Sequence, residues 1–255
     1  MSTRLVNAEF LKLRKRRGLV AAVSAVTILP MVVAYTILLT LHAGNPAKHG
    51  PAGGLENFAP SMEVLTTVAI VAAVLIGATL GTGDLSAGVF RELVVTGRSR
   101  FALYAARVPA GLALLLVPVA VAFAITAMAS RVFAGALEAP SATVLAQSGA
   151  WLALLAALSM ATALGVASLF SSRGTSIGIL LGWQLGLMPV LIAIGSLGSL
   201  REGLFYAAVN RLQPAALAEG DTPVPMSLAM ALIVLAAWTV VPFALGAWRT
   251  ATRDA

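Results

Sequence analysis

The sequence predicts an all-α, polytopic membrane protein with six transmembrane helices and both chain ends in the cytoplasm. Three observations lead to this fold class. Of the 255 residues, 59% are hydrophobic and 11% are charged, with a mean hydropathy of +0.94, whereas soluble domains carry about 25% charged residues. Six apolar runs approach or exceed the roughly 20 helical residues that cross the hydrocarbon core. The basic residues gather mainly on one side of these runs.

Residues 1–17 are expected to form an amphipathic elbow helix on the cytoplasmic face. At helical spacing, the apolar side chains of Phe10 and Leu13 share one side, and Lys12 and Arg16 share another. A basic amphipathic helix of this kind lies flat among lipid headgroups. Taken alone, the segment fits an orientation signal that also holds anionic lipid. The segment is also compatible with a surface that binds a cytoplasmic partner.

The six apolar runs make up a predicted transmembrane domain, 18–248, followed by a cytoplasmic tail, 249–255. The second run is the shortest, and the fourth is long enough to tilt. Internal prolines are compatible with these helices because neighbouring helices can satisfy the freed carbonyl groups. The first run is interpreted as a retained helix, since signal-peptide cores have about 7–15 apolar residues. The runs cover residues 18–41, 64–80, 101–128, 144–170, 174–197 and 226–248.

The distribution of basic residues predicts the orientation. Thirteen of the 17 Lys and Arg residues fall in the N-terminal segment, the segment after the second run with Arg107, the turn after the fourth run, and the C-terminal segment. Cytoplasmic loops carry the excess of Lys and Arg in membrane proteins. We therefore expect the N-terminus and the C-terminus in the cytoplasm. The four basic residues on the other side are Lys48, Arg131, Arg201 and Arg211.

Residues 84–97 are predicted to form a short amphipathic helix in the cytoplasm. Asp84 can cap its start and Gly97 suits the position after its end, while Ser99 can cap the next helix. The pattern fits a solvated loop helix whose arginines only set the topology. It fits equally a docking helix for a cytoplasmic subunit. The residues of its apolar stripe are Leu85, Val89, Phe90, Leu93 and Val94.

The elbow, the six runs and this segment together resemble the ABC-2 type membrane-subunit family of ABC transporters. In that family the segment after the second helix reads Glu, then Gly-Thr, then a Leu-rich stretch, then Pro-x-Ser-Arg and a further basic residue. The departures in this sequence are Asp for Glu, Val for Thr and Gly for Pro. The stretch 210–218 also resembles the external Leu-x-Pro stretch of the family. The matching residues are Asp84, Gly88-Val89, Leu93, Gly97-Arg98-Ser99-Arg100 and Arg107.

The resemblance implies that this segment is a coupling helix that sits in a cleft of a separate ATP-binding subunit. It also implies two membrane subunits, identical or different, above two ATP-binding subunits. Phe90 and Leu93 would fill the cleft, and the charged residues would fix the register, since electrostatics contributes specificity more than affinity. The expected coupling residues are Asp84, Gly88, Phe90, Arg91, Glu92, Leu93, Arg98, Ser99 and Arg100.

Several classes of function are excluded by what the sequence lacks. It has no G-x-x-x-x-G-K-[ST] motif, so ATP and magnesium are expected in a partner subunit. No ionisable residue lies well inside a run, which argues against ion-coupled carriers and intramembrane enzymes. With no Cys, thiolate sites are absent. We expect no catalytic, cofactor-binding or metal-binding residue, and no nucleic-acid partner, because the basic residues flank apolar runs.

The fifth run and the segment after it carry further signals. Glycines at every fourth residue form a smooth helix face, which lets another helix approach closely, within the subunit or across a dimer. Gln184 is a candidate for the substrate path, although polar residues in spans more often bond to neighbouring helices. Residues 200–213 are expected to form an external interfacial helix. The four glycines of the helix face are Gly174, Gly178, Gly182 and Gly186.

The expected function is the permease subunit of an ATP-driven exporter in the bacterial cell membrane. A pathway without charged residues suits hydrophobic or amphiphilic substrates such as drugs, antibiotics, lipids or peptides. Two alternatives stay open at this point. One is a membrane anchor or assembly protein that recruits a cytoplasmic partner through the same helix. The other is a passive channel.

Overall fold

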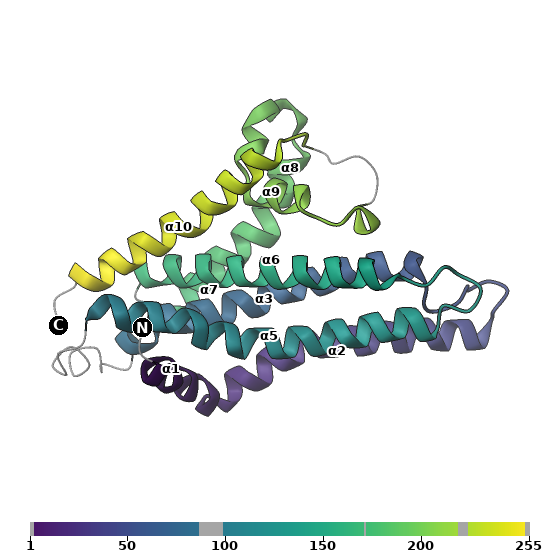
Figure 1. Cartoon of the computed structure of the whole chain (residues 1–255), viewed down its shortest axis with the longest axis horizontal. Helices are drawn as coiled ribbons and strands as arrows, with labels where there is room; N and C mark the ends of the chain where they lie inside the picture. Colours follow the sequence, from purple (N-terminus) through teal and green to yellow (C-terminus); the bar gives the residue numbers. More distant parts are fainter. Residues whose placement is uncertain (1–2, 87–98, 171, 219–223, 253–255) are drawn as a thin grey trace.

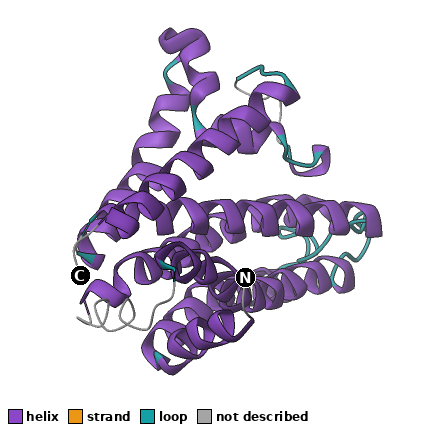
Figure 2. Ribbon diagram, turned by 60° about the vertical axis from the view of Figure 1, so that its left-hand side comes forward, coloured by secondary structure: helices purple, strands orange, loops and turns teal. Residues whose placement is uncertain are grey.

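The computed structural model describes residues 3–86, 99–170, 172–218 and 224–252, and these ranges contain helices and loops but no strand (Figure 2). The predicted all-α fold class is confirmed. The elements in chain order are α1 Thr3–Lys15, α2 Arg17–Gly44, α3 Leu55–Ser86, α5 Arg100–Val132, α6 Ala142–Leu169, α7 Arg173–Leu181, the π-helix η1 Gly182–Leu187, α8 Met188–Ala193, the 3-10 helix η2 Gly195–Gly203, α9 Phe205–Arg211, the 3-10 helix η3 Ala215–Leu217 and α10 Leu228–Thr252.

The long helices α2, α3, α5 and α6 form a bundle along the long axis of the molecule (Figure 1). Both chain ends lie at one end of this bundle, which we call the terminal end. The connections between α2 and α3 and between α5 and α6 lie at the other end, which we call the loop end. The segment from α7 to α10, which we call the arm, leaves the terminal end beside α6 and diverges from the bundle toward the loop end.

Six helices are long and apolar enough to cross a membrane, which confirms the predicted number of spans. The second span differs from its prediction, because it covers Leu55–Gly83 rather than 64–80 and is therefore not the shortest. Its first three turns contain Glu56 and Glu63, which lower the local hydropathy without interrupting the helical backbone. The six helices are Arg17–Gly44, Leu55–Gly83, Arg100–Val132, Ala142–Leu169, Arg173–Ala193 and Leu228–Thr252.

The fifth predicted run, 174–197, is not one regular helix. It consists of α7, the π-helix η1 and α8, and it ends at Ala193. The cause is Pro189, which has no backbone N–H to bond to the residue four positions earlier. The N–H of Met188 instead bonds to the carbonyl of Trp183, five residues back, which is the π-helical pattern. The predicted external helix is likewise divided, into the end of η2 and the separate helix α9.

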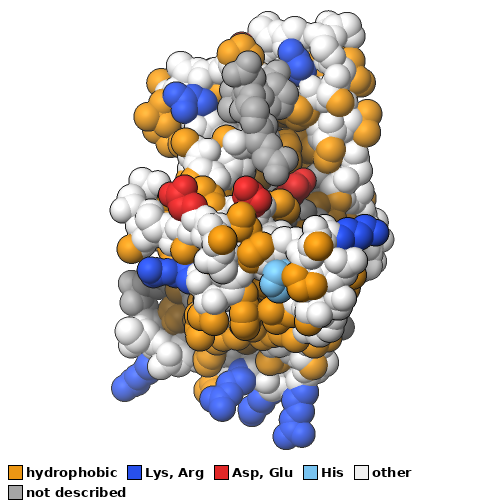
Figure 3. Space-filling view, turned by 90° about the vertical axis from the view of Figure 1, so that its right-hand side faces the viewer, with side chains coloured by type: hydrophobic (Ala, Val, Ile, Leu, Met, Phe, Trp, Pro, Cys, Tyr) orange, Lys and Arg blue, Asp and Glu red, His pale blue; other side chains and the backbone are white. Residues whose placement is uncertain are grey.

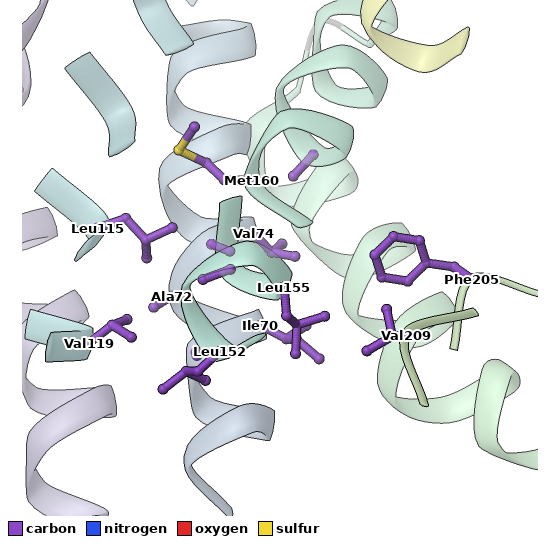
Figure 4. Close-up of a cluster of buried hydrophobic side chains, with 14 of the residues drawn as sticks. Ile70, Ala72, Val74, Leu115, Val119, Leu152, Leu155, Met160, Phe205 and Val209 are labelled. Carbon is purple, nitrogen blue, oxygen red and sulfur yellow. The ribbon is translucent and has the colours of Figure 1, made fainter. Parts of the chain in front are cut away.

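Helices α3 and α6 approach closely because small residues face each other. A β-carbon added to Gly77 would lie 2.6 Å from the β-carbon of Ala163, and one added to Gly81 would lie 2.7 Å from that of Ala167. Packing contacts drive helix association in lipid, and small residues allow the backbones to approach. Larger side chains fill the adjoining core between α3, α5, α6 and α9 (Figure 4). This core holds α3 at the centre of the bundle.

Several buried hydroxyl groups in the bundle bond to their own helix. The hydroxyls of Thr27, Thr79 and Thr82 each donate to a carbonyl four residues earlier. This pattern satisfies a polar side chain without a partner on another helix. A direct link between helices is made by Tyr35 in α2 and Ser130 in α5, whose oxygens are 2.6 Å apart.

Candidate functional site

The elbow segment forms α1, which packs against α5 near the terminal end. Leu13 is buried, Phe10 is half-buried and Arg16 is exposed. Lys12 reaches back one turn, and its Nζ lies 2.6 Å from Oε1 of Glu9. Glu9 is itself buried, with 7% of its surface exposed. The sequence analysis missed this burial, although the i, i+3 spacing of Glu9 and Lys12 was a signal for a charge pair.

Part of the predicted coupling segment lies outside the residues that the structure describes. Asp84 lies in the last turn of α3, and its side chain is among the parts not described. The roles predicted for the remaining residues stay predictions. The coupling residues that fall outside the described ranges are Gly88, Phe90, Arg91, Glu92, Leu93 and Arg98.

The structure brings the flanks of the coupling segment together at the terminal end. Ser99 occupies the N-cap position of α5, although its side chain makes no capping hydrogen bond. Arg100 donates from Nη1 to the carbonyl oxygen of Ala251 in the last turn of α10, at 2.8 Å. A β-carbon on Gly83, near the end of α3, would lie 3.3 Å from Nη2 of Arg16. The end of α3 therefore lies near the residue after α1, and the start of α5 lies beside the end of α10.

Arg107 occupies a different place from the predicted one. It was assigned to the cytoplasmic side with the coupling segment, but it lies inside α5 and is only 4% exposed. Its guanidinium carbon sits 5.7 Å from the ring centroid of Tyr104, a cation–π arrangement. The Tyr104 ring lies 4.9 Å from the ring of Phe243 in α10. Arg107 is thus a buried ionisable residue at the eighth position of α5, toward the terminal end of the helix.

The four glycines of the fifth span do not contact another helix within the described part of the subunit. A β-carbon on Gly174, Gly178, Gly182 or Gly186 would have no neighbour within 4 Å. Of the two possibilities predicted for this face, the structure does not contain the close contact within the subunit. The contact across a dimer stays a prediction.

A cavity of about 290 Å³ lies between the bundle and the arm. Its walls come from α3 and α6 on one side and from η1, α8 and α9 on the other. In Figure 4, Phe205 and Val209 of α9 face Ile70 of α3 and Leu155 of α6. We call this the first cavity. Its lining residues are Met62, Glu63, Thr66, Thr67, Ile70, Trp151, Leu155, Gln184, Leu185, Met188, Pro189, Phe205, Tyr206, Val209, Asn210 and Gln213.

A second cavity, also of about 290 Å³, adjoins the first. It lies between α6, α7, η1, α9 and α10, and its surface is almost entirely apolar. Gln184, Met188 and Phe205 line both cavities and therefore form the boundary between them. All three are buried. A small movement of this boundary would join the two spaces into one longer path.

Gln184 is the polar residue at this boundary. Only 9% of its surface is exposed, and its Oε1 has no hydrogen-bond partner among the described residues. The indole Nε1 of the adjacent Trp183 is also without such a partner. A buried polar atom left without a partner costs about 1–3 kcal/mol. Gln184 also lies in a π-helix, an element that is rare and is frequent at functional sites. These observations support its predicted place on a substrate path.

The sequence analysis missed the other residues that build this site. Trp183 and Trp238 pack with their ring centroids 5.7 Å apart. Nε1 of Trp238 donates to the carbonyl of Gly203 at 2.9 Å, and its carbonyl accepts from Thr162 at 3.1 Å. Pro189, with Gly182 and Gly186 close before it, was the available signal for a break in the fifth span.

The chain has the architecture of a polytopic, α-helical membrane protein with an internal cavity beside a broken span. Residues 5–189 match a sequence model of the family described as ABC-2 family transporter protein. The match covers more than half of the chain, so the chain belongs to the ABC-2 transporter family. The matched residues include most of α1, the predicted coupling segment and the cavity walls from α3, α6 and η1. No curated protein sequence matches the chain.

Proposed function

We propose that the chain is the permease subunit of an exporter driven by two copies of a separate cytoplasmic ATP-binding subunit. Membership of the ABC-2 family supports a permease role. The 255 residues contain no phosphate-binding G-x-x-x-x-G-K-[ST] motif, which supports a partner as the source of ATP hydrolysis. The excess of basic residues around the terminal end supports a cytoplasmic location for that end, in a bacterial cell membrane.

The observation that supports this function most directly is the course of α3. This one helix runs from Leu55 to Ser86. Its first half supplies Met62, Glu63 and Ile70 to the first cavity, and its last turn leads into the predicted coupling segment. A packed helix moves as a rigid body when one end is pushed. Motion of an ATP-binding subunit at the terminal end would therefore reach the cavity wall through α3.

The character of the cavities supports a hydrophobic or amphiphilic substrate. Ligand sites for such molecules are mostly apolar clefts with a few placed polar groups, and both cavities fit that description. The two cavities are separated by Gln184, Met188 and Phe205. Movement of these three side chains, driven by α3, would connect the first cavity to the second and so open a substrate path in steps.

Reconstitution tests the proposal. The chain is placed in vesicles alone or together with the ATP-binding protein that co-purifies with it, and accumulation of a fluorescent hydrophobic dye against its gradient is followed. We expect uphill transport only with both proteins and ATP, because the chain has no energy source of its own. Transport against a gradient by the chain alone would contradict the proposal. Dye flow down its gradient that does not depend on ATP would indicate a channel.

We further propose that a second membrane subunit covers the glycine face of the fifth span. Gly182→Leu should then reduce the yield of the assembled complex in detergent by about tenfold, because a bulky side chain prevents close helix approach. The measurement is size-exclusion chromatography with mass determination. Gly18→Leu is the matched control, since a β-carbon at Gly18 also has no neighbour within 4 Å. Unchanged assembly of the Gly182 variant would place the subunit contact elsewhere.

A further inference from the structure

We propose that the first cavity binds an organic cation, an ammonium-type group carried on an apolar body. This inference rests on the proposed function, because it names the chemical class of the transported molecule. It is drawn from three features of the cavity: its charge, its aromatic lining and the unpartnered amide oxygen of Gln184. Each feature favours a positively charged, hydrogen-bond-donating group, and together they discriminate against anions.

The charge of the lining comes from Glu63. It is the carboxylate among the described lining residues, and none of the Lys, Arg and His residues that the structure describes lines the cavity. No described residue forms an ion pair with the Glu63 carboxylate. The hydroxyls of the neighbouring Thr66 and Thr67 donate to backbone carbonyls of their own helix. The Glu63 side chain is exposed, so its carboxylate lies at the solvent-accessible side of the cavity, where it attracts a cation that enters.

The aromatic lining adds a second attraction for a cation. Trp151, Phe205 and Tyr206 line the cavity, and the faces of aromatic rings attract ammonium groups, including quaternary ones. The Trp151 ring is held in place, since its Nε1 donates to the carbonyl oxygen of Val209 at 3.2 Å. A fixed ring loses little conformational entropy when a ligand binds. The Glu63 carboxylate and the aromatic rings line the same cavity, and together they form a site for a positively charged organic molecule.

Gln184 supplies the third feature at the inner boundary of the cavity. Its buried Oε1 has no partner among the described residues, and an amide oxygen accepts hydrogen bonds. A ligand with an N–H group can satisfy this atom, whereas an anion would be repelled by it. The apolar side chains of Met62, Ile70 and Met188 provide the surface for the apolar body of the ligand.

The loop end of the bundle carries further charged residues of both signs outside the cavity lining. Figure 3 looks onto that end and shows acidic side chains across the middle of the face, with Lys and Arg side chains above and beside them. Glu56 lies in the first turn of α3, seven residues before Glu63, and the Glu138 carbonyl bonds to the N–H of Leu55 at 2.7 Å. Because Glu56 lies outside the cavity lining, its carboxylate is a reference for charge effects that do not come from the site.

The experiment measures binding to the purified full-length chain without ATP or partner. The probes are phenyltrimethylammonium and its uncharged isostere tert-butylbenzene, and the readout is tryptophan fluorescence, because Trp151 lines the cavity. We expect the cation to bind more tightly than the isostere. Glu63→Gln should weaken binding of the cation by about threefold to fivefold and leave the isostere unchanged, since it removes one solvent-exposed charge pair.

Glu56→Gln is the matched control, because it removes the same charge from the same helix outside the cavity lining. Gln184→Met keeps the size of the side chain and should weaken primary and secondary ammonium analogues severalfold. Equal affinities for the two probes, or equal losses in the Glu56 and Glu63 variants, would overturn the cation site. The transport assay gives a separate result: selective binding without ATP-dependent transport would contradict the proposed function and leave the binding site intact.

Discussion

Replacing Leu93 with aspartate should abolish the ATPase stimulation and the partner retention of the co-purified complex, while the chain still inserts into the membrane. In the proposed complex, the apolar stripe of the predicted coupling helix would insert Leu93 into a hydrophobic cleft of the ATP-binding subunit. A carboxylate without a partner in such a cleft costs at least about 3 kcal/mol. That cost corresponds to about a hundredfold loss of affinity. Co-purification on a tagged chain and ATP hydrolysis are the two measurements.

The effect should depend on the side of the helix rather than on the added charge. Thr96→Asp introduces the same charge off the predicted stripe, and we expect it to retain the partner and at least half of the stimulated activity. The flanks described at the terminal end make this segment a suitable lever, because α3 ends and α5 begins beside it and Arg100 ties α5 to Ala251. If both variants keep normal hydrolysis, the segment is not the coupling element.

The number of spans could be predicted because the bilayer imposes a strong constraint on the sequence. Each crossing needs about 20 apolar residues with internally satisfied backbone groups, so hydropathy alone identifies six helices. Helix ends were less predictable. The α3 helix starts at Leu55, nine residues before the apolar run, because polar residues can continue a helix beyond the hydrocarbon region.

The site could be predicted only in part, because it depends on which helices meet. Gln184 was identified from its polarity within a span. Glu63, Phe205 and Tyr206 come from other elements, and nothing in their local sequence links them to Gln184. Trp151 illustrates the same point: its place near the end of a run is typical of an interfacial residue, yet it is buried and bonds to Val209.

The number of regularly spaced glycines on a helix does not determine whether another helix packs against them. The fifth span has four glycines at i+4 spacing, but within the described residues their face is open. The second span has only Gly77 and Gly81 at this spacing, and these two pack against α6. The difference lies in the partner helix, because α6 presents Ala163 and Ala167 at matching positions. A sequence pattern on one helix cannot report the residues on the other.

The double substitution Gly77→Ala and Gly81→Ala should strongly destabilise the folded chain. Each added β-carbon would lie less than 3 Å from α6, and the nearest atoms include the carbonyl oxygens of Met160 and Leu164. Backbone atoms of a packed helix cannot move aside as a flexible side chain does, so α3 and α6 must separate. Overpacking of this kind costs about 1–3 kcal/mol per site. The apparent melting temperature in detergent should fall sharply, and the yield of monodisperse protein with it.

Gly178→Ala provides the comparison that isolates the helix contact from helix propensity. A β-carbon there meets no described atom within 4 Å, and alanine is favoured over glycine in a helix interior by about 1 kcal/mol. Measured on the monomeric chain, in which no second subunit covers the glycine face, this variant should therefore be as stable as the parent or slightly more stable. Each of the three substitutions adds one methyl group to a membrane helix, but only those at Gly77 and Gly81 lie at the α3–α6 contact. Equal melting temperatures for the two variants would mean that α3 and α6 do not approach each other at Gly77 and Gly81.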